Sequence, residues 1–135
     1  MPREILLFSI KSNSSDRELV FDSPQGDYFT VEIRGSSLQA TCVVWGYTDT
    51  DMLVDLFVHL ASYERPWSGN KDWESLEGEL YLSANCSSLG EVTFSIRIRG
   101  HQGSPEEWEA SAMLTTELGQ LPNIAAGARR FFGDS

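Results

Sequence analysis

The sequence has few cysteines, few histidines and few basic residues. Its 135 residues include two cysteines and two histidines. Secreted domains that rely on disulfides carry more cysteines, so we expect Cys42 and Cys86 to be free, buried thiols. Ten lysines and arginines stand against 20 aspartates and glutamates, which gives a formal net charge of −10. This charge repels nucleic acids and favours basic partners, although acidity also serves solubility alone.

Long apolar runs are also missing from the chain. The apolar run near the N-terminus, at residues 5–8, is too short for a signal peptide, and no stretch reaches membrane-spanning length. We therefore expect a cytoplasmic protein with no membrane partner. No linker, repeat or low-complexity tract divides the sequence, so we expect residues 1–135 to form a single domain.

The sequence contains none of the common metal or phosphate motifs. There is no Cys-x-x-Cys, no His-Glu-x-x-His and no phosphate-binding glycine loop. Asp49, Asp51 and Asp55 resemble part of a calcium loop, but the required glycine and final glutamate are absent. We interpret these carboxylates as helix-capping and dipole-compensating groups, and we expect no metal and no cofactor.

Candidate catalytic residues are equally few. His59 follows Asp55 at a spacing typical of a surface helix contact, and Cys42 is the only conceivable nucleophile for it. His101 lies in a glycine-rich turn, where a solvated side chain is the default. A solvated surface is also the simpler interpretation of the acidic cluster formed by Glu106, Glu107 and Glu109. We therefore expect that the protein is not an enzyme.

Hydrophobic periodicity predicts strands in two parts of the sequence, before and after a central helical segment. Apolar and polar residues alternate with a period of two in the first third, before and after a predicted turn at 23–27. A long hairpin is predicted next, followed by a last strand whose start is also compatible with a helix. The predicted strands cover residues 5–10, 17–22, 29–33, 38–44, 80–86, 92–98 and 108–114.

Two segments have helical periodicity instead. Residues 50–64 predict an amphipathic helix, and apolar residues from Leu121 to Phe132 predict another, with Pro122 in its first turn. The order strands, helix, strands, helix predicts an α+β fold, an antiparallel sheet meander with helices packed on one face. The other face is expected to be wet, because it would carry Glu32, Glu79, Arg97 and Arg99.

The segment from Trp67 to Gly78 is the most unusual part of the sequence. It combines two tryptophans, two glycines and alternating charges between a predicted helix and a predicted strand. The simpler interpretation is that Trp67 and Trp73 close one end of the core. The alternative is a partner-binding surface with aromatic residues at its centre and charges at its rim. Its residues would be Trp67, Lys71, Trp73, Glu74 and Glu77.

The same segment carries a resemblance. Trp-x-Gly-x-x-x-Trp-x-Ser-Leu-Glu-Gly at residues 67–78, followed by Leu80, Leu82 and Ala84, resembles an uncharacterised family of small bacterial proteins. That family is common in actinobacteria and is known as a domain of unknown function, so the resemblance implies no activity. In size, acidity and layout the chain is also similar to immunity proteins of bacterial polymorphic toxin systems.

These observations lead to two functional hypotheses. The first is a non-enzymatic protein-binding module, an immunity protein that covers the active surface of a cognate toxin or another basic protein, as a monomer or homodimer. The alternative is a small-molecule-binding or enzymatic domain with a pocket between sheet and helices. That pocket would be lined by Trp45, His59, Trp67 and Trp73.

Overall fold

A computed structural model describes residues 7–46, 49–100 and 103–133. The first part of the chain folds into a four-stranded antiparallel meander. Its strands are β1 (Leu7–Lys11), β2 (Glu18–Gln25), β3 (Tyr28–Arg34) and β4 (Ala40–Trp45). After α1 (Asp49–Ala61), a second four-stranded meander follows. It consists of β5 (Lys71–Glu74), β6 (Leu80–Cys86), β7 (Glu91–Arg99) and β8 (Glu109–Glu117). A 3₁₀ turn at Leu118–Gln120 leads into α2 (Leu121–Phe132).

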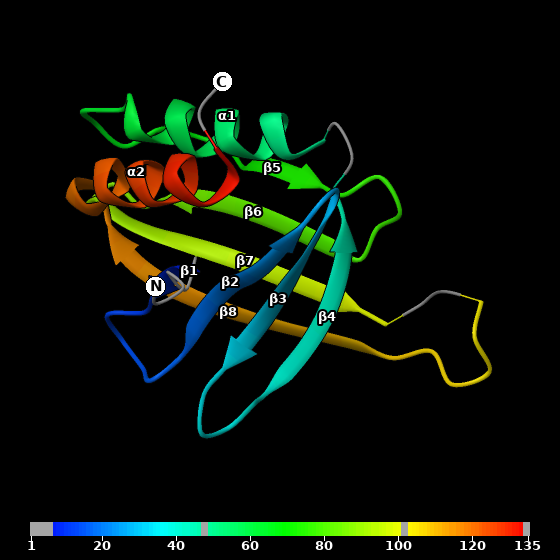
Figure 1. Cartoon of the computed structure of the whole chain (residues 1–135). Helices are drawn as coiled ribbons and strands as arrows, with labels where there is room; N and C mark the ends of the chain where they lie inside the picture. The colour runs from blue at the N-terminus through cyan, green and yellow to red at the C-terminus, as the bar shows by residue number, and fades with distance from the viewer. Residues whose placement is uncertain (1–6, 47–48, 101–102, 134–135) are drawn as a thin grey trace, which may run out of the picture.

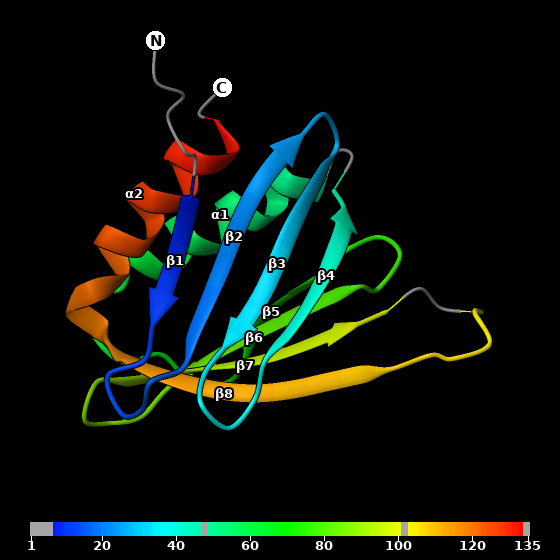
Figure 2. The ribbon, with the colours of Figure 1, turned by 60° about the horizontal axis from the view of Figure 1, so that its bottom comes forward.

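The predicted α+β class and the antiparallel meander are confirmed, but the strands form two sheets instead of one. The strands of the first sheet run across those of the second, and α1 and α2 lie together along one side of the molecule (Figures 1 and 2). The helix between β4 and β5 separates the two meanders along the chain, and β4 pairs only with β3 among the described strands.

Both sheets and both helices contribute to one hydrophobic core. Phe21 of β2 is fully buried, and its ring centroid lies 5.1 Å from Phe8 and 5.9 Å from Phe132 of α2. Phe57 of α1 lies edge-on to Phe8 at 5.6 Å and 6.4 Å from Phe94 of the second sheet. Helix α1 therefore joins the apolar faces of the two sheets.

Several element boundaries differ from the predictions. The turn predicted at 23–27 is shorter, because β2 continues to Gln25 across an irregularity at which Ser23 has a φ of 51°. Residues 71–74, predicted as a link, form β5 against β6. The start of the first predicted strand, at Ile5, lies outside the described residues.

The prediction that the charged residues share one solvent-exposed face is wrong. Glu32 lies on the outer face of the first sheet, where it pairs with Arg34 (Nε–Oε1, 2.6 Å). Arg97 and Arg99 lie on the outer face of the second sheet. The residues therefore belong to separate surfaces, because the chain forms two sheets that each have one face turned away from the core.

Candidate functional site

Trp67 and Trp73 are core residues. Each side chain is only 7% exposed. Trp73 lies opposite Leu82 on the inner face of the β5–β6 pair, and Trp67 is stacked on Tyr63 with ring centroids 4.9 Å apart. The structure thus supports the interpretation that these rings close one end of the core, and it leaves little of their surface for a partner.

The three charged residues that were predicted in the same segment as partner-binding residues do not form one surface. Lys71 is partly exposed at the start of β5. The exposed Glu74 pairs with Arg97 (Oε2–Nη2, 2.6 Å) on the outer face of the second sheet. The exposed Glu77 instead lines a groove together with residues from both sheets.

We call this hollow the β4 groove, because residues of β4 form one wall of it. It encloses about 590 Å³. Across from β4 lie the ends of β6 and β7 and the connection to β8. Its lining consists of Tyr28, Thr41, Cys42, Val43, Trp45, Glu77, Glu79, Arg99, Gly100 and Trp108.

Three large apolar side chains of the groove are exposed. The exposed fractions are 57% for Val43, 52% for Tyr28 and 39% for Trp108. Trp108 is held against Gly100, whose backbone N donates to the Trp108 carbonyl at 3.1 Å. A Cβ atom at position 100 would lie 2.1 Å from Nε1 of Trp108, so this ring position requires glycine.

The polar side of the groove is built on Glu79. Its Oε2 accepts a hydrogen bond from the backbone N of Trp45 (3.0 Å), and its Oε1 accepts one from Ser75 Oγ (2.7 Å). This carboxylate therefore fixes the end of β4 to the start of β6. Arg99 donates from Nε to the Gly78 carbonyl (3.0 Å), and its Nη2 lies 3.9 Å from Glu74 Oε2.

The only nucleophile considered from the sequence, Cys42, is unsuited to that role. Its Sγ donates to the Glu79 carbonyl (3.8 Å), and the side chain is buried. Burial, reinforced by the Glu79 carboxylate, raises the pKa of the Cys42 thiol to about 12, whereas a reactive cysteine needs a lowered one. His59 is exposed on α1, with Nε2 3.0 Å from the Tyr63 hydroxyl, so it has a different partner.

The pocket predicted between sheet and helices does not gather its four predicted residues. Trp45 lines the β4 groove, His59 and Trp67 both contact Tyr63 beyond the end of α1, and Trp73 points into the core. His101 lies outside the described residues. Over the part of the chain that the structure describes, no group of three or more histidine, cysteine or acidic side chains could hold a metal ion.

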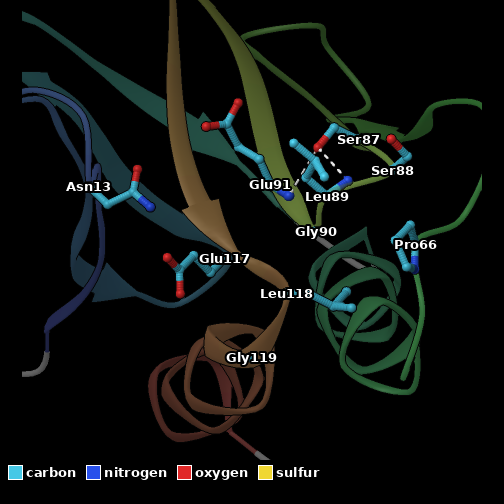
Figure 3. Close-up of a pocket in the computed structure, with 10 residues that line it drawn as sticks. All are labelled: Asn13, Pro66, Ser87, Ser88, Leu89, Gly90, Glu91, Glu117, Leu118 and Gly119. Atoms are coloured by element: carbon cyan, nitrogen blue, oxygen red, sulfur yellow. Dashed lines mark hydrogen bonds between the residues drawn. The ribbon is translucent and has the colours of Figure 1, made fainter.

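A second hollow, of about 730 Å³, lies where the β6–β7 turn meets the end of β8. Figure 3 shows that its polar groups belong to turns and strand ends. Ser87 Oγ accepts hydrogen bonds from the backbone N of Leu89 (3.3 Å) and of Glu91 (3.2 Å), so it stabilises the turn. Because Ser87 Oγ is used within the turn, this hollow offers less polar capacity to a ligand. We regard the β4 groove as the stronger candidate site.

Sequence reasoning missed most of the β4 groove. It selected Glu77, and it named Trp45 only for a different pocket. Val43 and Trp45 are apolar residues that share the outer face of β4 with Thr41, and this break in the alternation was the available signal. The approach of Trp108 to Gly100 depends on the hairpin geometry and had no such signal.

Among the helices that the structure describes, none has the length and apolar character needed to cross a membrane. A comparison with curated proteins finds none that matches this chain. A family of unknown function, DUF6228, matches residues 11–135, which include β2 to β8, both helices and every residue of the β4 groove. The chain therefore belongs to the DUF6228 family of unknown function.

Proposed function

We propose that this protein is a non-enzymatic module that binds another protein through the β4 groove. The observation that carries the proposal is the exposure of Tyr28, Val43 and Trp108 around one hollow. Partly exposed aromatic side chains beside charged groups are typical of the residues that contribute most to binding a protein partner. Apolar side chains gathered at one place on a protein surface and rimmed by polar groups often mark an interaction site.

The charge of the chain favours a basic partner. A net charge of −10 speeds encounter with a positively charged protein and opposes binding to nucleic acid. The narrower form of the proposal is an immunity protein that covers the active surface of a cognate toxin. It is supported by the similarity in size, acidity and α+β layout to immunity proteins. We propose a cytoplasmic site of action, where such a partner would be neutralised.

The proposal can be tested with the product of the neighbouring gene. We expect that product to co-purify with this protein and, if it is toxic, the protein to protect cells from it. Replacing Tyr28 and Trp108 by alanine should weaken the complex about tenfold or more. Met113→Ala is the matched control, because Met113 is 59% exposed on the outer face of the second sheet. Equal affinity of both variants would contradict binding through the groove.

The volume of the groove favours one alternative, a small-molecule ligand. Ligand pockets commonly enclose about 300–1,000 Å³, and the β4 groove falls in this range. A thermal-shift screen against metabolites distinguishes the two functions. A ligand that raises the melting temperature of the wild type, but not of the Tyr28→Ala, Trp108→Ala double variant, would favour the small-molecule function.

A further inference from the structure

The backbone of β4 presents hydrogen-bonding groups to the β4 groove. Gly46, just after β4, donates from its N to the Asp27 carbonyl (2.7 Å), so its peptide groups point towards the β3 side. The backbone N–H and C=O groups of successive residues in a strand point to alternate sides. Those of Thr41, Val43 and Trp45 therefore point away from β3. The hydrogen bond from Trp45 N to Glu79 agrees with this alternation. The N–H and C=O groups of Thr41 and Val43 therefore face the groove.

The edge strands β8 and β4 differ in whether another segment of the chain covers their outer edge. The outer edge of β8 is covered by the β1–β2 turn, where Asn13 N donates to the Thr115 carbonyl (2.9 Å) and Arg17 Nη1 to the Met113 carbonyl (3.0 Å). The edge strand β4 has the sequence Ala-Thr-Cys-Val-Val-Trp, without the lysine or proline that commonly prevents pairing with another strand. It is thus suited to receive one.

The groove is suited to cationic side chains. Glu77 and Glu79 line it, and Glu107 and Glu109 flank Trp108 in the sequence. Arg99 also lines the groove, but its guanidinium is engaged by Gly78 and Glu74. The face of an exposed tryptophan such as Trp108 attracts an ammonium or guanidinium group. Carboxylates and an aromatic ring together therefore favour lysine or arginine.

From these features we infer that the β4 groove receives an extended, basic segment of the partner protein, which adds to the first sheet as a strand beside β4. This inference rests on the proposed protein-binding function. Main-chain hydrogen bonds to Thr41 and Val43 supply affinity, as in other cases of strand addition, and the acidic and aromatic lining selects lysine and arginine. A second copy of this chain fits less well, because each copy carries a net charge of −10.

A displayed library of random heptapeptides, selected on the full-length protein, tests the inference without knowledge of the partner. We expect selected peptides to be enriched in lysine and arginine. Their dissociation constants should rise about tenfold for Val43→Pro, which lacks the N–H that faces the groove, and for Glu77→Lys. Proline is tolerated on edge strands. The matched control is Glu64→Lys, because Glu64 is exposed and does not line the groove.

A second measurement covers the case that Val43→Pro fails to fold. Alternate backbone nitrogens of a selected peptide form two sets, and only one set pairs with β4. N-methylation of that set should abolish binding, and N-methylation of the other set should leave binding unchanged. The inference is overturned if no peptide is selected, if selected peptides are acidic, or if the two N-methylated peptides bind equally. It is also overturned by a homodimer that Val43→Pro dissociates. If the partner is still lost from the Trp108→Ala variant, protein binding stands and only strand addition fails.

Discussion

At the scale of single residues, the two cysteines differ in their surroundings. Cys42 is a buried residue of β4, whereas Cys86 is partly exposed at the end of β6. Burial raises the pKa of both thiols, and for Cys42 the pKa reaches about 12. Because the thiolate is the reactive form, Cys42 should react very slowly in the folded protein.

We predict that a thiol reagent modifies one cysteine in the native protein and the second only after unfolding in guanidinium. The Cys86→Ser variant should show no reaction before unfolding. A rapid native reaction in that variant would contradict the burial of Cys42.

The tryptophans show how far residue roles could be predicted. Trp67 and Trp73 are conspicuous in the sequence by their spacing, and both are buried for different reasons: Trp73 lies on the inner face of β5, and Trp67 stacks on Tyr63. Trp108 lies in a segment compatible with either strand or helix, and its exposure depends on the glycine opposite it. A single sequence shows which rings are present but not which of them the chain covers.

At the scale of elements, α2 packs on β1 through a glycine. A Cβ atom on Gly127 would lie 2.8 Å from Cδ1 of the buried Phe8. Alanine favours a helix by up to about 1 kcal/mol relative to glycine, but overpacking a core costs about 1–3 kcal/mol.

We therefore predict that Gly127→Ala lowers the free energy of unfolding by about 1 kcal/mol, measured by urea denaturation. Gly119→Ala is the control, because nothing lies within 4 Å of its Cβ position. A stabilising effect of Gly127→Ala would show that α2 and β1 are less closely packed.

The β7–β8 pair places two like charges opposite each other. Glu91 and Glu117 are register partners, and both are exposed. Like charges at such a position destabilise a sheet by a few tenths of a kcal/mol. Glu117→Lys should therefore raise the free energy of unfolding by about 0.5 kcal/mol, less at high salt.

The same substitution at Glu109 should have the opposite sign, because Glu109 lies opposite Arg99. Both changes can be measured by thermal unfolding at low and high salt. If the stability of both variants changes in the same direction, the cross-strand partners in the β7–β8 register do not determine the effect of these charges.

The elements themselves were largely predictable, and their assembly was not. Alternation over β6 and β7 and the apolar stripe of α2 are local properties, and the structure confirms all three elements. The division into two sheets depends on β4 ending beside Glu79 without pairing to a strand of the second sheet. No local pattern encodes that contact.

At the scale of the whole molecule, the net charge of −10 should control the speed of association with a basic partner. We predict that the association rate constant falls about tenfold or more between low and high ionic strength, while the dissociation rate constant changes little. Stopped-flow or surface plasmon resonance measurements would show this. An association rate that does not depend on salt would contradict electrostatic steering.

The central claim is that the protein works through the β4 groove. Hydrogen exchange, followed by mass spectrometry with and without the bound partner, tests this most directly. We predict that binding protects the backbone amides of β4 and of residues 106–109 and leaves those of α1 and β5 unchanged. Protection confined to α1 or β5, with β4 exchanging at its free rate, would contradict the account.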